Sequence, residues 1–295
     1  MASYVASAIR SKHPLAELTW AIESRCMAMV DSDRLINHLV DFPRDRWRKS
    51  RWSHKVWREQ LSKFAGLRQR SYDFGLDLQG HSKTAVCLRI ARPKQRIAAF
   101  ATDSLAKRLN PLLPGNPDEK HRVERMMDAA QAFGDFQVPA NPMMPVPISK
   151  NELGLPDGKP LATISTGAGA TFKQYPPKQW EEVINGLIAS GLNVLSLGAA
   201  SDPKLQVQGL VDQVGKWNLR QTMSAVAHSD IHLAADTGTG HMAAAFGVPF
   251  VSVFGPTDPK LFRPYSDNGV VLRNSDNPAD VSASEILAAV NQLLA

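Results

Sequence analysis

The sequence contains few of the residues that would indicate a disulfide framework, a zinc site or a membrane span. Its 295 residues include two cysteines, Cys26 and Cys87, which are far apart and lie in no CxxC or Cys/His cluster. A disulfide framework and a structural zinc site are therefore not expected, and a reducing cytosol suits the composition. No apolar run reaches the ~20 residues of a membrane span, and the first residues lack the features of a signal peptide. We therefore expect a cytoplasmic protein.

Several catalytic motifs are also missing. The eight histidines show no HExxH spacing, and no GxSxG sequence offers a serine nucleophile. The glycine-rich stretch 166–173 (TGAGATFK) has neither the GK[ST] ending of a P-loop nor the acid that follows a dinucleotide fingerprint, which disfavours an oxidoreductase. Asp31-Ser32-Asp33 resembles the DxD of metal-dependent sugar transferases but has no supporting ligand, so we predict no metal site.

Positive charge is in excess. The net charge of +6 and the isoelectric point of about 9.4 indicate an anionic partner, which is a nucleotide, an acidic sugar, a nucleic acid or a membrane surface. The basic stretch 43–55 (PRDRWRKSRWSHK) contains Trp47 and Trp52, and two interpretations stay open: a solvated helix face or an anion-binding site. Lys83 is predicted in the first turn of a helix, where the dipole does not favour a cation, so it either binds something outside the helix or is simply solvated.

Predicted helices and strands alternate along the chain, which indicates an α/β protein. Helices are predicted over 2–12, 56–70, 82–90, 121–134, 177–190, 204–211, 220–228 and 241–246. Strands are predicted over 18–22, 74–78, 96–100, 161–166, 193–198, 231–235 and 250–254. Because prolines crowd the region between the two halves, we predict domains over 1–138 and 161–281, a linker over 139–160 and a C-terminal helix over 282–295.

The segment 231–259 (IHLAADTGTGHMAAAFGVPFVSVFGPTDP) organises the second half. It reads as strand, glycine turn, helix and strand, and it therefore places two loops at the carboxyl ends of parallel strands, where α/β sheets bind ligands. Gly238 and Gly240 allow a ligand to approach the unpaired N–H groups of the helix, which suits a phosphate. Hydroxyls of Thr237 and Thr239 add donors, and His241 offers a further donor or positive charge.

Three more side chains are candidates for the same edge of the sheet. Lys173 follows a glycine-rich turn and can balance a diphosphate. Asp202 follows the strand 193–198, and it either accepts hydroxyl groups of a ribose or caps a helix. The same two alternatives hold for Asp236.

These residues lie in motifs that resemble a known family. The run Lys173-Gln174-Tyr175-Pro176 with Trp180, the run LGAA at 197–200, and DTGTGHMAAAFGVP with FGPTDP resemble the donor domain of glycosyltransferase family 9, the ADP-heptose:lipopolysaccharide heptosyltransferases. In the first half, FPRDRWRKSRW and YDFGLDLQGHSKTA resemble the acceptor domain of its heptosyltransferase I type. The resemblance covers nearly all of the chain.

The resemblance implies a GT-B fold, in which two Rossmann-like α/β domains face a central cleft. It implies an inverting, metal-independent and cofactor-free transfer of heptose from ADP-heptose to a Kdo-containing inner-core acceptor of lipopolysaccharide. The expected partners are a nucleotide-sugar donor and an anionic lipid-linked acceptor at the cytoplasmic face of the inner membrane, with peripheral attachment and no nucleic acid.

The resemblance also assigns residues. Lys173 and His241 would stabilise the leaving group, Asp202 would bind the ribose where the family more often has glutamate, and Trp217 would contact adenine. The donor-binding residues are thus Lys173, Asp202, Trp217, Asp236, Thr237, Gly238 and His241. The acceptor-binding residues are Arg46, Arg48, Lys49, Asp77, Gln79, Gly80 and Lys83.

One part of the family pattern is not found. The family begins with a strand and a glycine-rich loop whose aspartate is the expected general base, and Met1 falls just beyond the position of that loop. We therefore expect no catalytic base within the 295 residues, unpaired strand edges in the first domain, and a chain that binds ADP but transfers heptose slowly. A catalytically impaired, nucleotide-binding relic of the family is the corresponding alternative.

Overall fold

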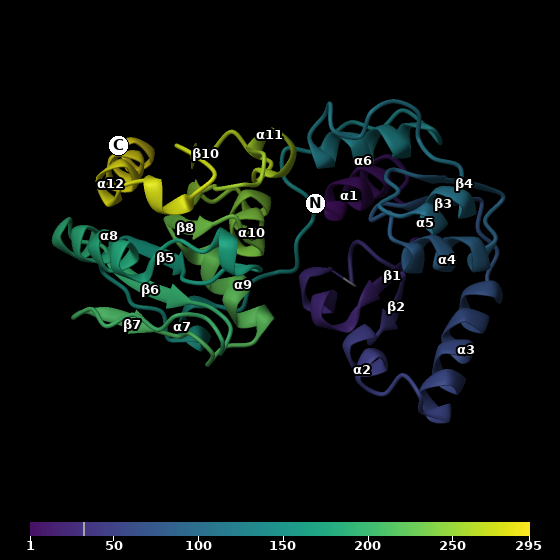
Figure 1. Cartoon of the computed structure of the whole chain (residues 1–295), viewed down its shortest axis with the longest axis horizontal. Helices are drawn as coiled ribbons and strands as arrows, with labels where there is room; N and C mark the ends of the chain where they lie inside the picture. Colours follow the sequence, from purple (N-terminus) through teal and green to yellow (C-terminus); the bar gives the residue numbers. More distant parts are fainter. Residues whose placement is uncertain (32) are drawn as a thin grey trace. The chain divides into compact units, whose positions relative to one another are not determined.

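The computed structural model describes residues 1–31 and 33–295, and the chain divides into two compact units, Met1–Met143 and Met144–Ala295. The division falls within the predicted linker, of which residues Lys150–Leu153 form the short helix α7. Each unit contains parallel strands connected through helices, as expected for an α/β protein (Figure 1).

Unit 1 contains two separate parallel sheets of two strands each, β1 with β2 and β3 with β4. Within the described part of the chain, each of these four strands therefore has one edge that pairs with no other strand, and β4 adds a single bridge from Ala98 to Leu112. Its strands are β1 (Thr19–Glu23), β2 (His38–Phe42), β3 (Phe74–Asp77) and β4 (Gln95–Ala98). Its helices are α1 (Ala2–Lys12), η1 (Ser24–Met29), α2 (Arg44–Lys49), α3 (His54–Arg68), α4 (Ser82–Ala91), α5 (Ser104–Leu109) and α6 (Arg122–Gln131).

Unit 2 contains one parallel sheet of six strands in the order β10-β9-β8-β5-β6-β7. Its strands are β5 (Leu161–Ser165), β6 (Asn193–Leu197), β7 (Leu210–Asp212), β8 (Ile231–Ala235), β9 (Phe250–Val253) and β10 (Gly269–Leu272). Its remaining helices are η2 (Thr171–Lys173), α8 (Pro177–Ala189), α9 (Leu219–His228), α10 (Gly238–Phe246), α11 (Pro259–Phe262), η3 (Pro278–Asp280) and α12 (Ala283–Leu294).

The order of these strands creates a switch point between β5 and β8. From β5 the chain proceeds outward through β6 and β7, and it then returns to the other side of β5 as β8 and continues to β9 and β10. Loops that follow the two strands at such a point diverge, and the crevice between them is where sheets of this kind bind ligands.

The core of unit 2 lies between the sheet and the pair α8 and α12. Ala162 and Ile164 of β5 pack into it with the buried Trp180 of α8. Gly186 permits α12 to pack closely, because a Cβ there would lie 2.5 Å from Leu287. The C-terminal helix is thus an integral part of unit 2, and its N-cap is Ser282, which accepts a hydrogen bond from the Glu285 N–H.

Two predicted elements of unit 2 need correction. Residues 204–211 form no helix; they lead into β7 as extended chain. Leu205 and Val207 face inward while Gln206 and Gln208 face outward, and this alternation is the period of a strand. Helix α10 begins at Gly238, three residues before the predicted start, so the glycine turn is itself the first helical turn.

Candidate functional site

The predicted donor residues gather at the switch point of unit 2. Lys173 lies at the end of η2, in the loop that follows β5, and Asp236 directly follows β8. Their side chains form an ion pair with Nζ and Oδ2 2.6 Å apart. The Lys173 side chain is 25% exposed and that of Asp236 is 8% exposed, so the pair closes the gap between the two loops and leaves the lysine accessible.

The ion pair corrects one interpretation of Asp236. The N-cap of α10 is Thr237, not Asp236, and Thr237 makes no side-chain capping bond. The first N–H groups of α10 are therefore uncapped by side chains, and they carry the positive end of the helix dipole. Gly238 is exposed, and a Cβ on it would meet nothing within 4 Å. An anion thus has open access to this helix end.

Two threonines at this helix end have different tasks. The Thr239 hydroxyl donates to Ser165 Oγ at 2.7 Å and thereby fastens α10 to the end of β5. Thr237 Oγ1 lies 2.9 Å from Thr239 Oγ1, so its hydroxyl is held beside the open helix end and can rotate toward a ligand. His241 is half-buried in the first turn of the same helix.

Asp202 bridges the loops after β5 and β6. Its Oδ2 accepts a hydrogen bond from the Ala199 N–H at 2.7 Å, and no helix follows it, so the capping interpretation is wrong. The carboxylate lies against Gly167, where an added Cβ would be 2.1 Å from Cγ of Asp202. The glycine of the TGAGATFK loop therefore makes room for this carboxylate.

Trp217 lies beside the same loops. It is half-buried and precedes Asn218, the N-cap of α9, and the Gly215 N–H donates to the Gly198 carbonyl oxygen at 2.9 Å. The loop that carries Trp217 thus adjoins the loop that carries Asp202. All seven predicted donor residues lie at the carboxyl edge of one sheet.

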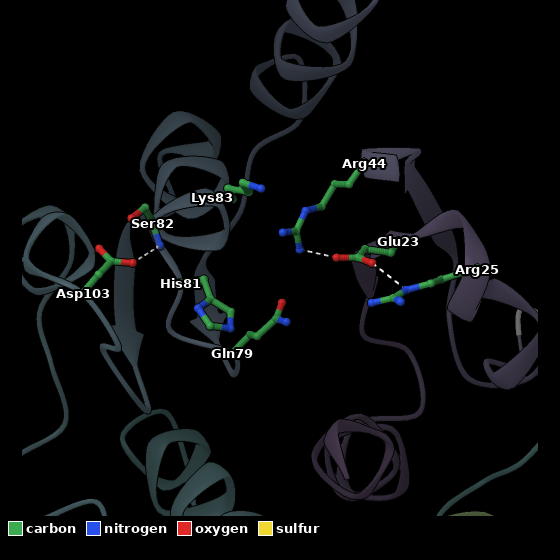
Figure 2. Close-up of a pocket in the computed structure, with 8 residues that line it drawn as sticks. All are labelled: Glu23, Arg25, Arg44, Gln79, His81, Ser82, Lys83 and Asp103. Carbon is green, nitrogen blue, oxygen red and sulfur yellow. Dashed lines mark hydrogen bonds and ion pairs between the residues drawn. The ribbon is translucent and has the colours of Figure 1, made fainter. Parts of the chain in front are cut away.

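A second candidate site is a cavity of about 370 Å³ in unit 1 (Figure 2). Two of the predicted acceptor residues, Gln79 and Lys83, line it. The sequence analysis missed the remaining lining residues: Glu23, Arg25, Arg44, His81, Ser82 and Asp103. In Figure 2, the side chains of Arg44, Glu23 and Arg25 face those of Lys83 and Gln79 across the cavity.

The cavity is strongly polar. Glu23 at the end of β1 pairs with Arg44 and with Arg25, the latter at 2.9 Å. Asp103 accepts a hydrogen bond from the Ser82 N–H at 2.9 Å, and hydrogen bonds from Ser82 and from the Ala106 N–H lower the pKa of Asp103 to about 2. Asp103 therefore stays ionised, and the cavity combines acceptors for hydroxyl groups with cations for an acid.

Two predicted acceptor residues hold the wall of the cavity instead of facing it. Asp77 is buried, and its Oδ1 accepts from the N–H groups of Gln79 at 3.0 Å and Gly80 at 2.9 Å, while Oδ2 accepts from Thr84 Oγ1. Gly80 has a φ of +75°, and a Cβ on it would lie 2.5 Å from the backbone of Phe100. Asp77 and Gly80 thus position Gln79 and the start of α4.

The other predicted acceptor residues, Arg46, Arg48 and Lys49, lie on α2 and do not line this cavity. Arg46 pairs with Glu59, and Arg48 lies 3.6 Å from Asp45. The carboxyl ends of strands offered a signal for the missed residues, since Glu23 ends β1 and Asp103 follows β4 closely. No sequence pattern linked the two, because Glu23 ends a strand of one sheet and Asp103 follows a strand of the other.

The DxD-like run falls partly outside the described residues, since Ser32 is not among them. Asp31 is buried and accepts hydrogen bonds from the N–H groups of Asp33 and Arg34 and from the Arg34 side chain, so its carboxylate serves the local turn. Across residues 1–31 and 33–295, no three acidic, histidine or cysteine side chains are grouped as metal ligands. The same residues include no helix that is long and apolar enough to span a membrane.

Comparison with known proteins gives a consistent result. Residues 60–288 match the sequence profile of glycosyltransferase family 9 (heptosyltransferase). The chain is 24% identical over 282 residues to lipopolysaccharide heptosyltransferase 1 of Escherichia coli O18:K1:H7, covering 90% of this chain and 84% of that protein. It is 27% identical to lipopolysaccharide heptosyltransferase 1 of Pseudomonas aeruginosa, covering 90% and 77%.

Solved structures share the fold. E. coli heptosyltransferase WaaC with ADP has a TM-score of 0.80 at 20% identity and covers 99% of this chain and 95% of its own. The family 9 glycosyl transferase from Veillonella parvula has a TM-score of 0.82 at 15% identity and covers 99% and 92%.

Proposed function

This chain belongs to glycosyltransferase family 9, the heptosyltransferases, and we propose that it transfers heptose from ADP-heptose to a Kdo-containing acceptor of the lipopolysaccharide inner core. It is a glycosyltransferase with the GT-B fold. The observation that carries the proposal is the uncapped N-terminus of α10 beside Lys173, at the switch point of the sheet in unit 2.

The proposed donor site binds the diphosphate of ADP-heptose. Backbone N–H groups at Gly238 and its neighbours meet the phosphates, and the ammonium group of Lys173 supplies the balancing charge. When the bond to the sugar breaks, negative charge grows on the departing ADP, so these donors stabilise the transition state more than the bound substrate. His241, in the same helical turn, adds a donor toward the leaving group.

The proposed ribose and adenine contacts lie on the other side of β5. Asp202 has one oxygen committed to the Ala199 N–H, which leaves Oδ1 for a ribose hydroxyl, and Trp217 offers an apolar face to the base. Asp236 acts chiefly through its ion pair, because it holds the Lys173 ammonium group at the mouth of the site.

The proposed acceptor site is the polar cavity of unit 1, together with Arg46, Arg48 and Lys49. Kdo is an acidic sugar, and its carboxylate suits Lys83 and the two arginines, Arg25 and Arg44, that share Glu23. Glu23 and Asp103 can accept hydrogen bonds from the sugar hydroxyls. We further propose that the protein works as a peripheral protein at the cytoplasmic face of the inner membrane, where a lipid-linked acceptor of this kind is presented.

Two measurements test the proposal. Calorimetric titration should show that ADP and ADP-heptose bind and that NAD does not, whereas preference for NAD would support the oxidoreductase alternative. Incubation with ADP-heptose and a Kdo-bearing lipid acceptor should then release ADP and extend the acceptor by one heptose. Binding of ADP-heptose without transfer would support the relic alternative.

A further inference from the structure

We propose that the exposed face of the α2–α3 hairpin docks the protein onto an anionic lipid bilayer. This docking face consists of three large apolar side chains, Trp52, Trp57 and Leu61, and two cations, Lys55 and Arg58. The inference deepens the proposed membrane-proximal transfer and rests on it for its biological meaning. Binding to lipid is nevertheless a property that is measured without donor or acceptor.

Helix α3 has apolar residues on two adjacent faces. One face carries Val56, Phe64 and Leu67, which pack with Phe42 and Trp47 into the local core. The other carries Trp57 and Leu61, one helical turn apart, and these are 55% and 65% exposed. A helix that only needed to cover its own core would have polar residues on this second face. The second face is therefore available for an apolar environment outside the chain.

The connection between α2 and α3 extends the same face. Trp52 is 83% exposed, and the guanidinium group of Arg51 lies 5.3 Å from the centre of its ring. The Trp57 indole N–H donates to the Arg51 carbonyl oxygen at 3.0 Å, which fastens the connection to α3. Two indoles are thus held outward on a restrained backbone. Tryptophan suits the boundary between lipid headgroups and acyl chains, because its ring is apolar and its N–H is polar.

The charge of the hairpin selects an anionic partner. Residues 44–70 include ten lysines and arginines but two acidic residues, a net charge of +8 that exceeds the +6 of the entire chain. The remainder of the sequence is therefore slightly acidic, and the positive field originates here. Among the described residues, Lys55, Arg58 and Arg68 form no ion pair with a carboxylate, so these charges are available to lipid phosphates.

Lipid fits this combination better than nucleic acid does. A nucleic acid partner would use the cations and the indoles, but it would leave Leu61 in water. A bilayer surface uses all three kinds of group at once, since apolar side chains enter the acyl boundary while lysine and arginine remain among the headgroups. The docking face would also bring Arg46, Arg48 and Lys49 of α2 close to the surface that presents a lipid-linked acceptor.

The test is sedimentation of the full chain with vesicles of phosphatidylcholine alone or with about 30% phosphatidylglycerol. We expect binding to the anionic vesicles only. The double variant Trp57→Gln/Leu61→Gln should weaken that binding by at least ~10-fold, as lost apolar burial predicts. Lys55→Glu/Arg58→Glu should weaken it by a similar factor and reduce its salt dependence. All variants should melt at the wild-type temperature and bind ADP normally, which excludes misfolding.

Matched controls separate the face from general effects. Leu15→Gln removes an apolar side chain that is 97% exposed elsewhere in unit 1, and Lys178→Glu/Lys204→Glu makes the same change of net charge in unit 2. Neither should alter vesicle binding. Equal losses in the controls, no binding by the wild type, or tighter binding to RNA than to the anionic vesicles would overturn the inference. Vesicle binding by a chain that transfers no heptose would refute the proposed transfer and leave the docking face standing.

Discussion

Replacement of Lys173 by alanine tests the donor site most directly. Lys173 pairs with Asp236, two residues before the start of α10, with Nζ and Oδ2 2.6 Å apart. A hydrogen bond to a charged group contributes roughly 1.5–3 kcal/mol. Because the Lys173 side chain is 25% exposed and its charge is partly neutralised by Asp236, we expect the lower half of that range. The dissociation constant for ADP should therefore rise by ~10- to 50-fold.

Titration calorimetry with ADP measures this effect, and Lys178→Ala is the matched control. Lys178 is exposed on α8, five residues away, and its loss changes the net charge equally. It should leave ADP binding unchanged. If Lys173→Ala binds ADP as tightly as the wild type and remains folded, Lys173 does not contact the diphosphate and the proposed donor site is wrong.

The double variant Lys173→Ala/Asp236→Asn refines the reasoning. In the single variant, the carboxylate of Asp236 is left nearly buried without its partner, which costs stability and repels the diphosphate. The double variant lacks that charge as well, so it should recover most of the melting temperature that the single variant loses. It should also bind ADP more tightly than Lys173→Ala alone. A double variant that binds ADP more weakly than the single variant would instead assign Asp236 a direct contact with the nucleotide.

Three further predictions concern other parts of the molecule. Gly238→Ala should fold with unchanged melting temperature, because its Cβ meets no neighbour, yet it should weaken ADP binding several-fold by covering the helix end, as calorimetry would show. Burial lowers the pKa of His232 from 6.5 to about 3. Between pH 6.5 and pH 3, His232 is therefore protonated in the unfolded chain but neutral in the folded chain. Stability should then fall by roughly 1.4 kcal/mol per pH unit toward pH 3, and denaturant titrations of His232→Leu should lack that component. Arg48→Glu/Lys49→Glu should impair acceptor use while sparing ADP affinity, because the two residues lie in unit 1 and the donor residues in unit 2; equal loss of both would indicate misfolding.

Much of the fold follows from local patterns in the sequence. Helix α1 and strand β8 have the predicted bounds, because each is a clear periodic run bordered by polar or turn residues. The prediction failed at 204–211, where leucine and valine alternate with glutamine. That alternation has the period of a strand, and the structure follows it in place of the predicted helix.

The role of Asp236 depended on information that its neighbours in the sequence do not contain. A carboxylate just before a helix is typical of an N-cap, and that preference is local. Its actual partner, Lys173, is 63 residues away and reaches it because β5 and β8 are adjacent in the sheet. The order of strands decides which loops meet, and that order follows from the packing of the entire unit.

The two candidate sites differ in how much of each can be predicted from the sequence. The difference depends on whether the site is formed by one local segment or by side chains from distant segments. The phosphate-binding part of the proposed donor site uses a helix end, a glycine turn and the residue after a strand, all within a few positions of one another, so 236–241 indicates a phosphate site even in isolation. The proposed acceptor cavity is lined mainly by charged side chains from separate segments, with Glu23 and Asp103 eighty residues apart in the chain. In the sequence, Glu23 and Asp103 each look like an ordinary surface charge. Only their proximity in the folded unit allows them to bind the same ligand. For the same reason, we expect single side-chain substitutions to change the specificity of the proposed acceptor cavity, whereas phosphate binding at the proposed donor site depends mainly on backbone N–H groups.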